Sequence, residues 1–489
     1  MKKKPRLVDA VLLLIGTLLM FSPPSDPDFG WHYKYGEYFF KFGHLLTENI
    51  FSYTYTDYVW VNSYWLFELI LFITHSILGS FIPTLILSFT ASFICLKLVR
   101  KVAQNEIAVY LSYVFLMGML GSYGVTIRPH FYSSLFTLFM LYALIFEPKL
   151  KKYLPFVYLF WVNLHAEFVI GLFMLGSHTL FTAVQKLRKG EKLTEIAKDF
   201  IVPAACAVVT LINPNGLGLH ITLFKELTLP VKNYVQEWSH FDTSSVEKYV
   251  TYVFLLSVSL VGGFVLRKKA GLWYFLLAIF FAVFSIKASY MIRVMFIFSF
   301  YGFLYGLDHF FTKLMNFLDE HNQLIIKRFV KYSYVASLIV VLVNGSWKII
   351  QASDIKYWSK ESKYPYDAVV YLKQNPIRGR MLNAYNWGGY LIWQYPERQT
   401  FIDGRMTSWR EDGKYFMEDY YKISQPETLN FYVEKYLITW VFDHPKSKLS
   451  RYLTQRNDLW EEYYRDDISV IFIKKSSKPK PYELLENVN

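Results

Sequence analysis

The chain's first apolar run is L-V-D-A-V-L-L-L-I-G-T-L-L-M-F at 7–21, and it is followed at 22–37 by S-P-P-S-D-P-D-F-G-W-H-Y-K-Y-G-E. The run is apolar except for Asp9, and the basic stretch M-K-K-K-P-R at 1–6 precedes it. A secretory signal peptide also begins in this way, but here no small-residue cleavage site follows and more apolar runs do. The stretch therefore predicts a first membrane span whose basic end lies in the cytoplasm.

The composition also indicates a membrane protein. Of the 489 residues, 53% are hydrophobic and 19% charged, which excludes a disordered chain, a disulfide scaffold and an ordinary cytosolic enzyme. Phe, Trp and Tyr make up 19%, and such rings suit a chain with much membrane–water boundary. The net charge of +13 is assigned to loop lysines and arginines that face anionic lipid, so membrane lipid and not nucleic acid is the expected partner.

Further apolar runs that are long enough to cross a bilayer lie near 80–98, 106–124, 129–147, 166–186, 199–213, 248–266, 271–286, 290–308 and 329–349. Two shorter runs, 64–79 and 153–163, are ambiguous. All the basic loops fall on one side only if 153–163 crosses and 64–79 is a re-entrant or interfacial piece. This interpretation predicts eleven crossings, with the N-terminus cytoplasmic and the C-terminus extracytoplasmic.

After Ile350 the hydropathy falls and the expected elements shorten. Helices are expected over 365–374, 387–394, 415–422, 427–436 and 448–454, and strands over 380–384, 399–402, 437–442 and 468–474. Alternating strands and helices are typical of a small α/β domain. The predicted fold is mostly α, with a polytopic helical membrane domain at 1–350 that carries an outer loop at 23–63. A soluble extracytoplasmic α/β domain follows at 351–489, either to recognise an acceptor or to close over the membrane site.

The outer loop begins with Asp26-Pro27-Asp28 directly at the membrane surface. Two carboxylates at this spacing can share a divalent cation such as Mg or Mn, or one can act as a general base while the other orients. Asp26 before a proline is also a good helix N-cap, which explains Asp26 but not Asp28. His32 lies one helical turn beyond Asp28 and can face the same cavity.

The residues after the acidic pair form a helical stripe. Trp31, Tyr35, Tyr38 and Phe42 recur at helical spacing, which predicts a short amphipathic helix that rests in the membrane interface.

The motifs resemble those of a large group of bacterial multispanning proteins in the GT-C superfamily of polyprenyl-phosphate-sugar-dependent glycosyltransferases. The matching pieces are D-P-D-F-G-W-H-Y-K-Y-G-E at 26, F-S-Y-T at 51, W-V-N-S-Y-W-L-F-E at 60, R-P-H at 128, N-L-H-A-E-F at 163, N-P-N-G at 213, Q-E-W at 236, W-G-G-Y-L-I-W at 387 and F-I-D-G-R at 401. Two positions depart from the group: Gly30 replaces an aromatic residue, and Ala166-Glu167 replaces two glycines.

The resemblance implies a fold, a reaction class and a site. It implies transfer of a hexosyl or pentosyl group from a polyprenyl-phosphate donor, with inversion by single displacement, at the outer face of the bacterial inner membrane. The acceptor is a glycan, a lipid or a protein. The family places a catalytic carboxylate in its first outer loop, which corresponds here to Asp26 or Asp28.

The leaving lipid phosphate needs a cation. The candidates are Arg128, Lys287 and Arg293, with His130 beside them. Placing a charged side chain at mid-span costs about 2.5–3.5 kcal/mol, and less near the interface, so a compensating interaction is expected for each of these cations. The alternative is that these side chains reach lipid headgroups.

Three further polar residues are candidates for positioning substrate. His165 and Glu167 lie between two spans, where they can ligate a metal, position the sugar or simply form a polar turn. Glu68 is expected to point into the site or to pair with a cation. Asp403 and Arg405 in the tail are interpreted as capping a turn.

One competing function needs the same number of spans, namely a transporter or flippase of lipid-linked glycans. Transporters often contain internal repeats and helices broken at mid-membrane. This sequence shows no repeat, and its polar residues gather at one surface, which favours the enzyme.

Overall fold

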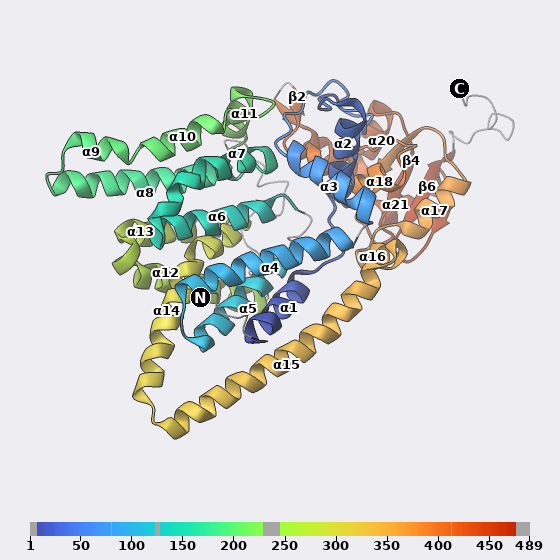
Figure 1. Cartoon of the computed structure of the whole chain (residues 1–489). Coiled ribbons are helices and arrows are strands. Elements are labelled where there is room, and N and C mark those ends of the chain that lie inside the picture. Colours follow the sequence, from blue (N-terminus) through green and yellow to red (C-terminus); the bar gives the residue numbers. More distant parts are fainter. Residues whose placement is uncertain (1–6, 80, 123–127, 228–244, 412, 476–489) are drawn as a thin grey trace. The chain divides into compact units, whose positions relative to one another are not determined.

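The computed structural model describes residues 7–79, 81–122, 128–227, 245–411 and 413–475 (Figure 1). Of the described residues, 71% are helical. By internal contacts the chain divides into two compact units. The first, here called the membrane unit, comprises the residues up to Pro23 together with Leu78–Ile350. The second, here called the outer unit, comprises Pro24–Ile77 and the residues from Gln351 onward.

The membrane unit is built of helices. They are α1 (Leu7–Met20), α4 (Ile82–Val102), α5 (Glu106–Ser122), α6 (His130–Ile145), the 3-10 helix η2 (Pro148–Tyr153), α7 (Leu154–Leu164), α8 (Phe168–Arg188), α9 (Leu193–Lys198), α10 (Ile201–Val209), α11 (Leu217–Leu227), α12 (Val246–Ala270), α13 (Leu272–Lys287), α14 (Met291–Phe317) and α15 (Glu320–Ala352). Within the described residues, five helices are long and apolar enough to cross a bilayer: α4, α8, α12, α14 and α15. The shorter α1, α5, α6 and α13 are also apolar. The protein is therefore a multi-pass membrane protein.

Each of the eleven predicted crossings coincides with a helix. Two of these helices are short, since α7 has 11 residues and α10 has 9. At about 1.5 Å per residue, each reaches roughly half of a 30 Å hydrocarbon core. The eleven crossings remain a prediction.

Small residues allow the helices of the membrane unit to approach closely. At the contact of α12 with α14, a methyl group on Gly302 would lie 2.3 Å from the carbonyl oxygen of Gly262. In α1, a methyl group on Gly16 would lie 2.1 Å from the hydroxyl of Tyr113 in α5. Helix pairs in membranes gain van der Waals contact in this way, because lipid tails offer no hydrophobic driving force between helices.

The outer unit combines short helices with a sheet. Its elements are α2 (Phe29–Phe42), α3 (Trp65–Leu78), α16 (Ile355–Glu361), α17 (Tyr366–Gln374), β1 (Arg380–Asn383), η5 (Tyr385–Trp387), α18 (Gly388–Gln394), η6 (Gly404–Thr407), β2 (Arg410–Glu411), β3 (Lys414–Tyr415), α19 (Phe416–Ile423), α20 (Pro426–Lys435), β4 (Ile438–Asp443), α21 (Lys448–Gln455), β5 (Trp460–Arg465) and β6 (Val470–Lys474). The four-stranded sheet has the order β1-β4-β6-β5. β1 is parallel to β4, while β6 is antiparallel to both β4 and β5.

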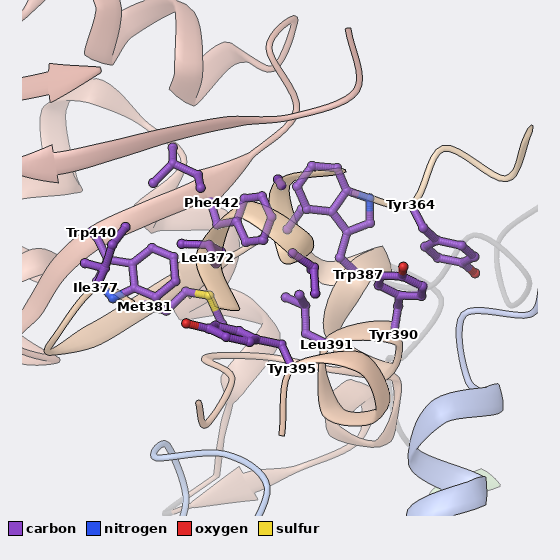
Figure 2. Close-up of a cluster of buried hydrophobic side chains, with 14 of the residues drawn as sticks. Tyr364, Leu372, Ile377, Met381, Trp387, Tyr390, Leu391, Tyr395, Trp440 and Phe442 are labelled. Carbon is purple, nitrogen blue, oxygen red and sulfur yellow. The ribbon is translucent and has the colours of Figure 1, made fainter. Parts of the chain in front are cut away.

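Large rings fill the core of the outer unit (Figure 2). Trp387 at the start of α18 packs on Phe442 of β4, with ring centroids 5.2 Å apart. Tyr364 and Tyr390 stack with their planes 1° apart. Burial of aromatic side chains of this size is the main stabilising contribution to a small domain.

The residues after the first span pack with the tail. Phe51 and Thr400 pair through backbone, and the Tyr53 hydroxyl donates to the carbonyl of Met381 in β1 at 2.9 Å. The strand expected over 399–402 is wrong, because only Thr400 forms a bridge there and its partner is Ser52. The sequence of the tail does not indicate this partner, because Ser52 lies almost 350 residues earlier in the chain.

The expectation that the stripe on α2 rests in lipid is wrong for its first half. Trp31 and Tyr35 are each 4% exposed and pack with Leu46 and Ile392 inside the outer unit. Helical spacing of aromatic residues identifies a buried face, but it does not distinguish a protein partner from lipid. Phe42 at the end of the helix is 60% exposed.

Candidate functional site

The acidic pair lies at the start of α2. The Asp28 backbone N–H donates to Asp26 Oδ1 at 2.9 Å, and the Phe29 N–H donates to the Asp26 carbonyl. Asp26 thus closes the turn that starts the helix. Asp28 occupies the N-cap position, but its carboxylate makes no capping bond. Instead its Oδ1 accepts from the indole N–H of Trp31 at 2.8 Å. Both aspartates are partly exposed.

Glycines bring the start of α2 directly against the tail. A methyl group on Gly30 would lie 1.9 Å from the Gly389 carbonyl oxygen, and one on Gly389 would lie 2.1 Å from that of Pro27. This contact explains why Gly30 is not aromatic in this chain. A methyl group on Gly404 would lie 1.8 Å from Asp28 Oδ1. The Asp28 carboxylate therefore occupies the space above Gly404 in η6.

A buried ion pair flanks Gly404. Arg405 donates from Nε and from a terminal nitrogen to the two oxygens of Asp403, both at 2.7 Å, and both side chains are 0% exposed. The Arg405 backbone N–H also donates to Asp403, so the predicted turn cap is present. Arg405 further donates to Tyr35 Oη at 2.8 Å and to Asn49 Oδ1 at 3.1 Å. Burial opposes the charge of Arg405, but Asp403 outweighs it and raises the pKa of the guanidinium.

A second buried polar group joins α2 to α3. His32 Nδ1 lies 3.1 Å from Glu68 Oε1, and Asn62 donates to Glu68 Oε2 at 2.6 Å. His32 therefore pairs with Glu68, and both are nearly inaccessible. Burial raises the pKa of Glu68 well above its ordinary value of 4.5, and the bond from Asn62 lowers it only in part.

Replacing Glu68 by glutamine is expected to remove a pH dependence of stability. Because the folded pKa of Glu68 is raised, its stabilising contribution is complete below pH 4.5 and is lost as the pH rises through the folded pKa. The glutamine stays neutral, so the Glu68→Gln variant should gain thermal stability relative to the wild type between pH 5 and pH 8. Thermal midpoints of both proteins across this range test the expectation. A difference that is constant with pH would contradict it.

In the membrane unit, the cationic candidate Arg293 of α14 is 6% exposed. It donates to Glu167 at the N-cap of α8, to Ser134 Oγ at 3.1 Å and to the His130 carbonyl at 3.5 Å. His165 Nδ1 lies 3.8 Å from Glu167 Oε2. Arg293, His130, His165 and Glu167 therefore come together.

A small pocket opens beside this cluster. Its free volume of about 10 Å³ has room for about one water molecule, and Ser134, Thr137, Trp161, Glu167 and Arg293 are among its lining residues. Ser133 beneath it accepts from the Trp161 indole at 2.7 Å and lies 2.8 Å from His165 Nδ1. The pocket thus offers one guanidinium, one carboxylate and hydroxyl groups inside the helix bundle.

The other predicted cations lie apart from this cluster or at its edge. Lys287 is exposed at the end of α13 and has no ion pair within the described part of the chain. Arg128 precedes α6 by two residues and is partly exposed. Q-E-W at 236 lies outside the described residues.

A metal site of three or more ligands is absent from the described residues, since no group of three His, Cys, Asp or Glu side chains is suitably placed. The carboxylates of Asp26 and Asp28 are oxygen ligands of the type that Mg or Mn prefers, but they are only two.

Sequence reasoning did not identify Trp31 and Gly404 as neighbours of Asp28. In the sequence, Gly404 stands out only as part of the D-G-R motif at 403–405. The motif does not indicate that this glycine lies against Asp28.

Several solved structures are similar to this chain. The oligosaccharyltransferase AglB from Archaeoglobus fulgidus, in complex with an inhibitory peptide and a dolichol-phosphate, matches with a TM-score of 0.59 at 12% identity, over 96% of this chain and 74% of its own. The same enzyme tethered to an acceptor peptide matches with a TM-score of 0.54 at 11% identity, over 96% and 73%. ArnT from Cupriavidus metallidurans, bound to undecaprenyl phosphate, gives 0.47 at 11% identity, over 97% and 98%. No family model and no curated protein matches the sequence.

At 12% identity the likeness shows the fold alone: this chain shares the membrane fold of AglB, while its place in the GT-C superfamily remains a prediction. The bacterial group with the D-P-D motif remains a prediction.

Proposed function

We propose that the protein is an integral-membrane glycosyltransferase that moves a hexosyl or pentosyl group from a polyprenyl-phosphate donor to an acceptor at the extracytoplasmic face of the bacterial inner membrane. The observation that carries the proposal is the acidic pair, Asp26 and Asp28, directly after the first apolar helix of a chain with the AglB fold. The AglB structures contain a dolichol-phosphate and an acceptor peptide, which supports a lipid-linked donor.

In the proposed reaction, Asp28 takes the proton from the acceptor hydroxyl as its oxygen attacks the anomeric carbon. The bond from that carbon to the phosphate oxygen breaks, and the lipid phosphate leaves with the electron pair. A single displacement inverts the anomeric centre. Trp31 holds one oxygen of Asp28, and Asp26 fixes the turn below it.

The leaving phosphate gains negative charge, which a preorganised cation stabilises. Arg293 is the main candidate, with Arg128, Lys287 and His130 as further ones and His165 and Glu167 positioning the substrate. A divalent metal held by Asp26 and Asp28 would supply the same stabilisation.

Arg293→Ala is expected to weaken donor binding by about tenfold or more, since that corresponds to the loss of roughly 1.4 kcal/mol from one charged contact. Glu167→Gln is expected to tighten donor binding, because it removes the carboxylate that now neutralises Arg293. Titration of labelled polyprenyl phosphate into protein in nanodiscs measures both. The control is Lys268→Ala, which replaces an exposed lysine in the last turn of α12. Unchanged affinity in Arg293→Ala would exclude Arg293 from the phosphate site.

The reaction itself is tested by incubating purified protein with a panel of labelled polyprenyl-phosphate sugars. Transfer or hydrolysis of one of these sugars would identify both the reaction class and the donor. Lipid scrambling without turnover would instead favour a flippase and overturn the proposal.

A further inference from the structure

Gly404 leaves the space in which the Asp28 carboxylate lies. A methyl group at this position would lie 1.8 Å from Asp28 Oδ1, 3.0 Å from its Cγ and 3.3 Å from Trp31 Nε1. Gly404 does not have a positive φ, so its backbone conformation does not require glycine. The three nearest atoms all belong to the side chains of Asp28 and Trp31, so a methyl group here would displace the Asp28 carboxylate.

The position of Gly404 is fixed from both sides along the chain. Asp403 and Arg405 form the buried pair, and Arg405 holds Tyr35 of α2 and Asn49 of the outer loop. Trp31, the residue that donates to Asp28, lies one turn before Tyr35 on the same helix. Through these bonds, the tail and α2 hold the Asp28 carboxylate between a donor and a glycine.

We propose that Gly404 is a positioning residue for the Asp28 carboxylate, so that the D-G-R turn of the tail is part of the active site. The catalytic consequence rests on the proposed function, in which Asp28 is the base. The tail then has a role beyond acceptor recognition, because the carboxylate is correctly oriented only while η6 lies against the start of α2.

The first test is a double-mutant cycle on stability, which needs no activity. Thermal midpoints are measured in nanodiscs for the full-length wild type, Gly404→Ala, Asp28→Ala and the double variant. Gly404→Ala should lower the midpoint in the presence of Asp28 and should have little effect once Asp28 is replaced by alanine, because the space is then vacant. An equal loss in both backgrounds would overturn the proposal, even if the single variant folds poorly.

The second test is kinetic. In Gly404→Ala the carboxylate must rotate away from Trp31, and a displacement of about 1 Å can cost on the order of 100-fold in rate. We expect kcat to fall by about that factor while KM for the donor changes less than about threefold, as expected for loss of an interaction that acts only in the transition state. Gly118→Ala in α5, where a methyl group meets open space, is the matched control.

The two tests separate the two proposals. A positive cycle with unchanged kcat would show that Gly404 contacts Asp28 without positioning it for catalysis, which overturns the inference. A positive cycle in a protein that turns over no lipid-phosphate sugar would contradict the proposed function alone.

Discussion

Asp28→Asn is expected to abolish sugar transfer while the protein still folds. Asparagine has the shape of aspartate and keeps an oxygen that can accept from the Trp31 indole, so the contacts at the start of α2 survive. It cannot take a proton from the acceptor hydroxyl. Loss of a general base typically costs about 10²–10⁴-fold in rate, roughly the range in which transfer falls to background. The measurement is transfer from the donor that the panel identifies, together with the thermal midpoint.

The matched variant is Asp26→Asn, which distinguishes the roles of the two carboxylates. The asparagine introduced there can still accept from the Asp28 N–H, so the turn before the helix is kept. A smaller loss than in Asp28→Asn would make Asp28 the base, whereas equal losses would favour a metal shared by both. Full activity of Asp28→Asn would remove Asp28 from the mechanism.

The sequence predicted the helices and most strands well, because the spacing of apolar residues within a short segment determines these elements. All eleven apolar runs that were predicted to cross coincide with helices, including the shorter run at 153–163. In the tail, α17, β1, α18, α19, α20, β4, α21 and β6 begin and end within two residues of the expected limits. The hairpin of β2 and β3 and the strand β5 were not expected. β5 reads W-E-E-Y-Y-R, whose charged residues are depleted in strands, and pairing with β6 outweighs that weak preference.

The candidate site was predictable only in part, because its contacts join distant residues. Asp26 and Asp28 were identified from adjacent sequence. Tyr35 and Arg405 lie 370 residues apart, and nothing in the pattern of either segment names the other. The stripe with Trp31 was attributed to lipid, although Leu46 of the loop after α2 and Ile392 of α18 pack against it.

Arg405→Leu is expected to destabilise the outer unit severely, because it leaves the Asp403 carboxylate buried without its partner. Removing one member of a buried, hydrogen-bonded ion pair costs about 3–5 kcal/mol, a large fraction of the stability of a small domain. Tyr35 and Asn49 lose their donor in the same step. Unfolding of the outer unit in urea, followed by pulse proteolysis, measures the loss.

The double variant, Asp403→Asn with Arg405→Leu, tests the physical cause. It removes both charges, while the asparagine can still accept the backbone N–H bond from position 405 that begins η6, since that donor is independent of the side chain there. If an uncompensated charge causes the loss, the double variant must be more stable than Arg405→Leu alone, although it carries one more substitution. If it is no more stable, the guanidinium acts through its bonds to Tyr35 and Asn49 and its contact with the Trp409 ring instead. In either case Arg405 supplies a buried bond between the tail and Tyr35 of α2, beside the close contact of Gly30 with Gly389.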